Sequence, residues 1–142
     1  MKPLFTIATV TYNAEATIER TLRSVALQDY AGIEHLIVDG CSKDRTLSLV
    51  KQYIEENKTP HSIRLISEPD KGLYDAMNKA LLNAKGDYIV FLNAGDCLRN
   101  SDTVSLLAQH EENGSLPAIL YGNTHLVDDE GHFLRLRRLS PP

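Results

Sequence analysis

The chain has 142 residues, of which 42% are hydrophobic and 24% are charged, as is typical of one globular domain with a real core. Its formal net charge of −4 argues against a general nucleic-acid-binding protein, which is usually basic. No apolar run approaches the ~20 residues that a membrane-spanning helix needs.

The N-terminal stretch is interpreted as a strand and not as a signal peptide. Residues 4–10 are apolar and β-branched, but threonines interrupt the run and no clear small-residue cleavage site follows. Without an export signal, Cys41 and Cys97 are expected to be free thiols in a reducing cytosol. The predicted location is therefore the cytoplasm, with the inner face of the membrane as an alternative.

Strand-like and helix-like patterns alternate along the next eighty residues. After the first strand, apolar residues recur at helical spacing within 14–28. The pattern continues with a strand at 33–38, a helix that begins at 42–44, a strand at 62–66, a helix at 73–84 and a strand at 88–92. Such alternation predicts an α/β fold, a mainly parallel Rossmann-like sheet with helices on both faces.

The pattern changes after Asp96. Residues 102–112 predict one more helix, and 118–127 and 132–139 flank the turn-forming sequence DDEG. The end of the chain is therefore predicted to be an antiparallel hairpin. The whole of 1–142 is expected to be a single domain.

Polar residues collect where the predicted strands end. They are Thr9 to Asn13, Asp39 to Ser42, Ser67 to Gly72, and Asn93 to Asp96. The carboxyl ends of parallel strands share one edge of the sheet, where ligands usually bind. A tyrosine can stack on a base, a lysine can neutralise phosphate and an aspartate can hold a divalent cation. The combination indicates a nucleotide diphosphate with a metal.

Each of these features also has a plain structural interpretation. Asp39-Gly40 is more often a turn, and Ser42 to Asp44 can simply cap a helix. Asn93 to Asp96 can be a capped turn, Lys71 can be solvated, and Tyr12 can be half-buried packing. The convergence of four polar strand ends on one edge favours the functional interpretation.

Taken together, the residues resemble those of family 2 glycosyltransferases of the GT-A fold. The resemblance covers nearly the whole chain and rests on two segments, TVTYNAEATIERTLRSVALQDYAGIEHLIVDGCSKDRTLSLV and EPDKGLYDAMNKALLNAKGDYIVFLNAGD. The positions that fit the family pattern are Ser24, Gln28, Val38, Asp39, Gly40, Ser42, Asp44 and Thr46 in the first segment, and Gly72, Asn78 and Lys85-Gly86-Asp87 in the second. The subgroup resembled comprises bacterial transferases that build surface polysaccharides such as colanic acid.

The resemblance implies a role for each candidate site residue. It places Thr9 and Tyr12 in the base pocket, Asp39 on the base or ribose, Asp70 and Lys71 beside the nucleotide, and Asn93 to Asp96 at the metal site. Uridine is the base that the family most often uses. Lys71 would lie near the diphosphate, and Asp96 would be the metal ligand.

The proposed metal site departs from the family pattern. Many relatives have Asp-x-Asp-Asp where this chain has Asn93-Ala94-Gly95-Asp96, so two carboxylates are lost. Diphosphate oxygens and water would then complete the shell of a Mg²⁺ or Mn²⁺ ion. The metal is therefore expected to bind weakly without the nucleotide.

The resemblance implies metal-assisted, inverting transfer of a sugar from a UDP-sugar to a saccharide or lipid-linked acceptor in polysaccharide biosynthesis. No catalytic base is assigned, because the late acidic cluster Asp128, Asp129 and Glu130 precedes Gly131 in a predicted turn. The chain ends sooner than expected for such an enzyme, so it is interpreted as the donor-binding part of a truncated transferase.

Two alternative functions remain open. A non-catalytic nucleotide-sugar-binding domain would share the same pocket. A receiver-like magnesium-binding signalling module would need an acidic pair after the first strand, where the chain has Thr-Tyr-Asn. Arg135, Arg137 and Arg138 are interpreted as a solvated edge strand, with an acidic membrane surface as the alternative partner. The sequence predicts no oligomeric state.

Overall fold

The computed structural model describes residues 2–110 and 114–139. The chain forms two compact units, Met1–Gln109 and His110–Pro142. The first unit contains all the residues predicted to form the site, and the second contains the C-terminal hairpin. The single domain expected over 1–142 stays a prediction.

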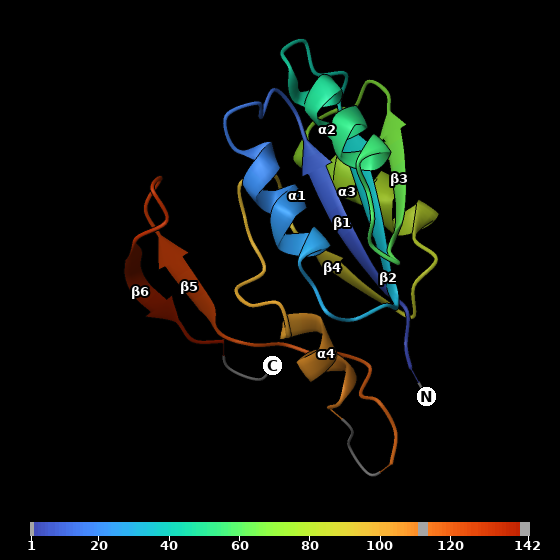
Figure 1. Ribbon diagram of the computed structural model, residues 1–142, viewed down its shortest axis with the longest axis vertical. Coiled ribbons are helices and arrows are strands. Elements are labelled where there is room, and N and C mark those ends of the chain that lie inside the picture. Colours follow the sequence, from blue (N-terminus) through green and yellow to red (C-terminus); the bar gives the residue numbers. More distant parts are fainter. Residues whose placement is uncertain (1, 111–113, 140–142) are drawn as a thin grey trace. The chain divides into compact units, whose positions relative to one another are not determined.

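A four-stranded parallel sheet is the centre of the first unit (Figure 1). Its strands are β1 (Phe5–Thr11), β2 (Ile33–Asp39), β3 (Ser62–Ser67) and β4 (Tyr88–Phe91), in the spatial order β3-β2-β1-β4. Every residue of β1 and β2 is buried, as the nearly continuous apolar sequence of these central strands predicts. The predicted parallel α/β fold is confirmed.

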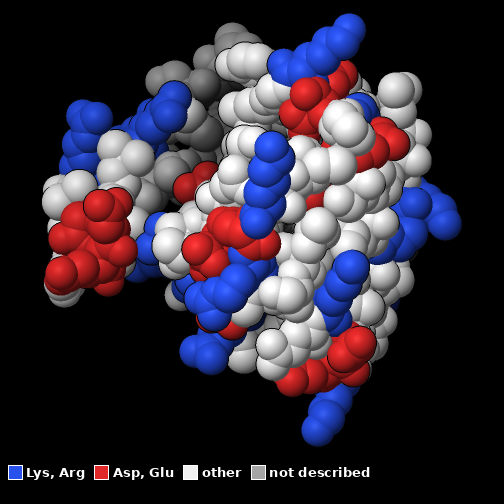
Figure 2. All heavy atoms as spheres, turned by 90° about the horizontal axis from the view of Figure 1, so that it is seen from above, with Lys and Arg blue, Asp and Glu red and all other residues white. Residues whose placement is uncertain are grey.

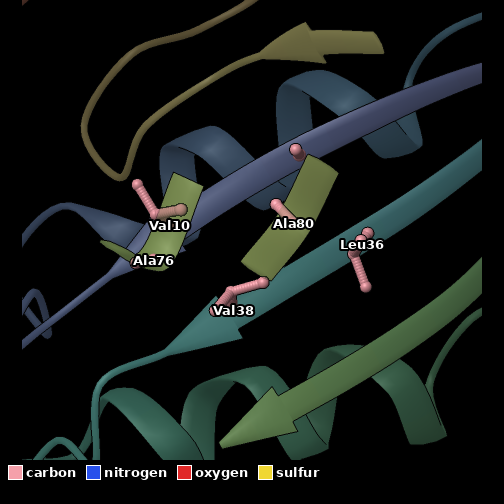
Figure 3. Packing of buried hydrophobic residues seen from close by; sticks show 6 residues of the cluster. Val10, Leu36, Val38, Ala76 and Ala80 are labelled. Carbon is pink, nitrogen blue, oxygen red and sulfur yellow. The ribbon is translucent and has the colours of Figure 1, made fainter. Parts of the chain in front are cut away.

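One face of the sheet packs against the helix α3 (Leu73–Asn83). The contact is a cluster of Val10, Leu36 and Val38 with Ala76 and Ala80 of α3 (Figure 3). The two helix residues are alanines, so no large side chain keeps the helix from the strands. The α3 residues next to the strand ends are thereby held firmly over the sheet.

The opposite face is covered by α1 (Ile18–Ala26) and α2 (Thr46–Glu55), as Figure 1 shows. Ile18 and Leu22 of α1 and Val50 of α2 are buried against Ile37 of β2. Their spacing in α1 is that of one helical face. Helices therefore lie on both faces of the sheet, and the predicted three-layer arrangement is confirmed.

Helix α1 also fixes the chain that follows β4. The Ser24 hydroxyl accepts a bond from the Leu98 amide at 3.1 Å. The Gln28 side chain donates to the Asn100 carbonyl at 2.7 Å and accepts from the Val104 amide at 3.1 Å. Ser24 and Gln28, which fit the family pattern, thus hold residues 98–104 beside the helix.

A buried carboxylate closes the amino-end edge of the sheet. Glu34 is 2% exposed and accepts bonds from the Thr6 hydroxyl, the Arg64 guanidinium and the Lys85 amide, at 2.8, 2.9 and 2.9 Å. Burial opposes the charge of Glu34, but these donors outweigh it and hold its pKa below the ordinary value. The adjacent Gly86 amide donates to Thr6 Oγ1 at 2.9 Å.

The end of the chain forms the predicted hairpin. Strands β5 (Thr124–Val127) and β6 (Phe133–Arg137) are antiparallel. The Asp128 carboxylate accepts bonds from the amides of Glu130 and His132, at 3.0 and 2.8 Å. The turn interpretation of this acidic cluster is confirmed for Asp128.

The helix expected at 102–112 is shorter than predicted. In the first unit, α4 spans Thr103–Ala108 and is capped by Gln109, while residues 111 and 112 lie outside the described residues. Throughout the described part of the chain, no helix has the length and apolar character needed to cross a bilayer.

Candidate functional site

A pocket of about 460 Å³ lies at the carboxyl ends of β1 and β2. That volume is within the range of small-molecule sites. Its walls come from the end of β1, the residue after β2, the loop before α3 and the first turns of α3. The lining residues are Val10, Thr11, Tyr12, Gly40, Pro69, Asp70, Gly72, Leu73 and Ala76.

Tyr12 and Asp70 are the two predicted site residues that line this pocket. The Tyr12 side chain is 59% exposed, so its ring is available to a ligand. The Asp70 carboxylate accepts a bond from the Gly72 amide at 2.9 Å through Oδ1. Both residues stand on short loops directly after strands, where the parallel fold places ligand-binding groups.

Two glycines shape the pocket wall around Asp70. A Cβ added to Gly40 would lie 2.6 Å from Asp70 Oδ2, so only glycine leaves room for the carboxylate in this position. Gly72 has φ 112°, a conformation that glycine adopts readily, and it caps α3. Sequence reasoning noted both glycines without assigning either to the site.

The loops that follow β1 and β2 are joined by reciprocal hydrogen bonds. The Asn13 amide donates to Ser42 Oγ at 2.9 Å, and the Lys43 amide donates to Asn13 Oδ1 at 2.8 Å. Asp44 accepts from the Glu15 amide at 3.1 Å and from the Thr46 hydroxyl. The Thr46 hydroxyl is the largest of the influences that lower the pKa of Asp44. These bonds fix the loop that carries Tyr12.

Asp39 lies beneath these loops with its carboxylate directed into the protein. It is fully buried and accepts bonds from the Ser42 amide, the Ser42 hydroxyl and the Ser67 hydroxyl. Asp39 therefore joins the ends of β2 and β3. The predicted contact of Asp39 with a base or ribose stays a prediction.

Thr9 is not among the residues that line this pocket, and its predicted place in the base pocket stays a prediction. It is fully buried, and its hydroxyl is 2.9 Å from His35 Nε2 within the sheet. The other ring nitrogen of His35 is 3.1 Å from the Tyr53 hydroxyl of α2. Burial, with a smaller contribution from His61, lowers the pKa of His35 to about 3. Burial also raises the pKa of Tyr53 to about 12.

The turn at residues 93–96 is attached to β1 and to α1. The Ala94 amide donates to the carbonyl of Val10, a pocket residue, at 3.2 Å. Gly95 has φ 103°, its amide donates to Thr21 Oγ1 at 2.8 Å, and its carbonyl accepts from Arg20 Nε at 2.8 Å. The turn that carries Asp96 is therefore held beside the end of β1.

The oxygens of this turn suit a hard cation only in part. Asp96 is exposed, and Asn93 Oδ1 is buried with no hydrogen-bond donor among residues 2–110 and 114–139. No group of three or more His, Cys, Asp and Glu side chains in the same described ranges is arranged to hold a metal. Asn93 and Asp96 are thus compatible with two positions of an oxygen-rich shell, with the rest left to a ligand and water.

Lys71 lies between two pocket residues but does not line the pocket itself. It is exposed, and its amide donates to the Asp75 carboxylate of α3 at 2.9 Å. The predicted role of its ammonium group stays a prediction.

Viewed along the vertical axis of Figure 1, acidic and basic side chains are interspersed over the surface (Figure 2).

A second pocket of about 830 Å³ lies between α1, α2 and residues 98–101. It is larger, but it contains none of the predicted site residues. Because ligands of parallel α/β sheets bind at the carboxyl edge, we take the smaller pocket at that edge as the candidate site.

Comparison with known proteins identifies relatives of this chain. A Bacillus subtilis protein, TuaG, which is named as a teichuronic acid biosynthesis glycosyltransferase, is 40% identical over 67% of this chain and 37% of its own length. The chain thus spans less than two fifths of that relative.

Solved structures of glycosyltransferases share the fold. A mannosyltransferase from Pyrobaculum calidifontis, in complex with GDP-Man and Mn²⁺, has a TM-score of 0.68 and 30% identity over 74% of this chain and 31% of its own. The S. aureus protein TarS (1–349), in complex with UDP-GlcNAc, has a TM-score of 0.62 and 32% identity over 72% of this chain and 29% of its own.

The sequence profile of one family spans almost the entire chain. It matches residues 6–139, which include the sheet, the pocket and the hairpin. This match and the solved relatives confirm the GT-A fold and set aside the receiver-like alternative. The chain belongs to glycosyl transferase family 2.

Proposed function

We propose that the pocket binds a nucleotide diphospho-sugar, with uridine as the base, and that the chain supplies the donor-binding part of a glycosyltransferase. The observation that carries the proposal is the position of Tyr12 and Asp70 in one pocket at the carboxyl edge of the sheet. The hydrogen bond that joins the turn carrying Asp96 to β1 also supports the proposal. With the base at Tyr12 and the diphosphate at Asp96, the two groups would lie over adjacent strand ends.

In this proposal, different residues of the chain bind the base and the diphosphate of the donor. The exposed Tyr12 ring stacks on the base, a contact that contributes about 1–3 kcal/mol in other nucleotide-binding proteins. Lys71 neutralises the diphosphate from the loop before α3. The α3 N-terminus, with Gly72 and Leu73 in the pocket wall, adds the positive end of a helix dipole.

A divalent cation completes the donor site in this proposal. Asp96 contributes a carboxylate and Asn93 its amide oxygen, which accepts no hydrogen bond within the described part of the chain, and diphosphate and water fill the remaining positions. A bound Mg²⁺ or Mn²⁺ would stabilise the negative charge that develops on the departing nucleoside diphosphate. The Mn²⁺ in the solved mannosyltransferase complex supports a divalent ion here.

The proposed reaction transfers the sugar, with inversion, to a saccharide or a lipid-linked acceptor in polysaccharide biosynthesis. The teichuronic acid assignment of the Bacillus relative supports this class of pathway. An inverting transfer needs a base that takes the acceptor hydroxyl proton. We assign that role to no residue, because Asp128 is engaged in its own turn.

A non-catalytic nucleotide-sugar-binding domain is the second candidate function. It is favoured by one observation: the described pocket accounts for the donor alone. Turnover of a radiolabelled UDP-sugar by the 142-residue chain, in the presence of saccharide or lipid-linked acceptors, would establish the transferase. Binding of the donor without turnover would favour the second candidate.

Thermal-shift screening tests the proposed ligand. Uridine, guanosine and thymidine diphospho-sugars are added with and without Mn²⁺, and the midpoint of unfolding is measured. We expect the uridine donor with Mn²⁺ to give the largest rise, because a ligand stabilises the folded state that binds it. A chain stabilised by none of these donors at millimolar concentration would contradict the proposal.

A further inference from the structure

Helix α1 bonds the turn that carries Asp96 on both sides of Gly95. The Gly95 amide donates to Thr21 Oγ1 at 2.8 Å, and the Gly95 carbonyl accepts from Arg20 Nε at 2.8 Å. The Asp96 amide in turn donates to the Asn93 carbonyl at 2.9 Å. Because the Gly95 carbonyl and the Asp96 amide belong to one planar peptide group, these bonds fix the orientation of the peptide that leads into Asp96.

Thr21 is a polar residue on the otherwise apolar buried face of α1. The other buried residues of the helix are Ile18, Leu22 and Val25, and Thr21 is 0% exposed. Threonine is a weak helix former, and a buried hydroxyl is unfavourable unless it is hydrogen-bonded. The partner of this hydroxyl is the Gly95 amide, so the polar group at position 21 serves the turn and not the packing of the helix.

The conformation of this turn sets the spacing of the two proposed metal ligands. Asn93 Oδ1 is buried and accepts no hydrogen bond from the described residues, and Asp96, three residues later, is exposed. Between them Gly95 has φ 103°, a conformation that the bonds from α1 hold in place. With only two protein oxygens for the ion, the separation and direction of these two oxygens determine how well both can bind it.

We infer that Thr21 is a positioning residue for the metal site: by accepting the Gly95 amide, its hydroxyl holds Asp96 where the carboxylate can share a divalent cation with Asn93. The inference rests on the proposed function, because it assumes that a cation binds at this turn together with a nucleotide. Thr21 acts through Gly95 and does not line the pocket. Its loss should therefore weaken the binding of the metal and leave the binding of the nucleotide alone unchanged.

Thr21→Val tests this role, because valine keeps the branched shape of the side chain and removes the acceptor. Calorimetry measures UDP affinity in EDTA and again in millimolar Mn²⁺. In EDTA the variant should bind UDP within about twofold of the wild type, since Tyr12 and Asp70 stand on other loops. The rise in UDP affinity that Mn²⁺ causes should be about tenfold smaller in the variant, as the loss of an outer hydrogen bond implies at metal sites. By linkage, the rise in Mn²⁺ affinity that UDP causes falls by the same factor.

Two further variants separate positioning from stability. Thr21→Ser keeps the hydroxyl and should restore the effect of Mn²⁺ to within about threefold of the wild type. Thr6→Val is the matched control, because Thr6 is also 0% exposed and its hydroxyl also accepts a glycine amide, that of Gly86 at 2.9 Å, at the opposite edge of the sheet. Both valine variants should lower the midpoint of thermal unfolding, because each leaves a glycine amide without its acceptor, but only Thr21→Val should reduce the effect of Mn²⁺. If Thr21→Val does not fold, Thr21→Ala takes its place in the same measurements.

The outcomes separate this inference from the proposed function. A folded Thr21→Val protein in which Mn²⁺ raises UDP affinity as much as in the wild type would overturn the inference. An equal loss in Thr6→Val, or no recovery in Thr21→Ser, would also overturn it, because lost stability or packing would then explain the effect. If the wild type binds UDP equally well with and without Mn²⁺, the role of Thr21 fails while the nucleotide site of the proposed function stands. If the wild type binds no UDP, the proposed function itself fails, and this assignment fails with it.

Discussion

At the scale of single residues, the type of residue was easier to predict than the direction of its side chain. Tyr12 and Asp70 line one pocket, because the loops that carry them follow the carboxyl ends of β1 and β3. Thr9 lies within β1 and Asp39 is the last residue of β2, and the side chains of a strand alternate between faces. Theirs are bonded within the fold, to His35 and to Ser42 and Ser67. Strand register, which sets these contacts, could not be derived from the sequence alone.

The exposed ring of Tyr12 gives the first residue-scale prediction. Tyr12→Ala should weaken UDP binding about 5- to 30-fold, which corresponds to the loss of about 1–2 kcal/mol of stacking. Tyr12→Phe should bind within about twofold of the wild type, because it keeps the ring. Tyr74→Ala is the matched control, since Tyr74 is 79% exposed and does not line the pocket. Equal affinities of Tyr12→Ala and wild type in calorimetry would remove Tyr12 from the site.

The buried His35 predicts a pH dependence of stability. Its pKa of about 3 in the folded state lies below the value near 6.5 of the unfolded chain. The neutral ring therefore contributes stability that is fully present above about pH 6.5 and is lost as the pH falls toward 3. Between pH 7.5 and 5, this loss is about 2 kcal/mol in the free energy of unfolding.

Urea denaturation of wild type and His35→Gln at pH 7.5 and pH 5 measures that loss. The glutamine variant is less stable at pH 7.5, but its stability should depend less steeply on pH, because one proton-binding group is removed from the unfolded chain. If both proteins lose the same free energy of unfolding between the two pH values, His35 does not stay neutral in the fold.

At the scale of elements, the alternation of strands and helices was predictable because its periodicity is local. Helix α1 is shorter than expected, since residues 13–15 bond the loop after β2 and the first residue of α2. Helix α4 was overestimated because apolar spacing alone does not show where Gln109 caps it. Tertiary hydrogen bonds such as those of Asn13 and Thr46 leave no periodic signal in the sequence.

Gly86 gives a prediction for the amino-end edge of the sheet. A Cβ at this position would lie 2.6 Å from the Thr6 amide nitrogen and 2.8 Å from the Tyr88 carbonyl oxygen, both backbone atoms. Gly86→Ala should therefore reduce the free energy of unfolding by about 1–3 kcal/mol, as overpacking does elsewhere. Gly122→Ala, which meets no atom within 4 Å, should change it by less than about 0.5 kcal/mol. Similar thermal midpoints for both variants would show that the strands can move apart without cost.

At the scale of the whole molecule, fold and family were both evident from the sequence, because the motifs lie at every strand end of one sheet. The division into two compact units was not predicted, since no linker composition marks residue 110. For the metal site, the sequence predicted a position at residues 93–96 but no complete set of protein ligands. The described residues around Asp96 supply too few ligands for a complete shell.

The incomplete shell predicts that metal and nucleotide bind together. Calorimetry should detect Mn²⁺ binding by the protein alone only at millimolar concentration, because one or two protein oxygens do not replace the ion's water shell. With UDP present, Mn²⁺ affinity should rise at least about tenfold, and Asp96→Ala should abolish that rise. Tight binding of Mn²⁺ without nucleotide would mean that the protein holds a complete site.

A crystal structure of the chain soaked with a UDP-sugar and Mn²⁺ tests the central claim most directly. We predict electron density for the uracil ring on Tyr12, in the pocket that Asp70 also lines, and for the diphosphate above the 93–96 turn. Density in the groove between α1 and α2, or on a surface away from Tyr12, Asp70 and Asp96, would contradict a donor site at the carboxyl edge of this sheet.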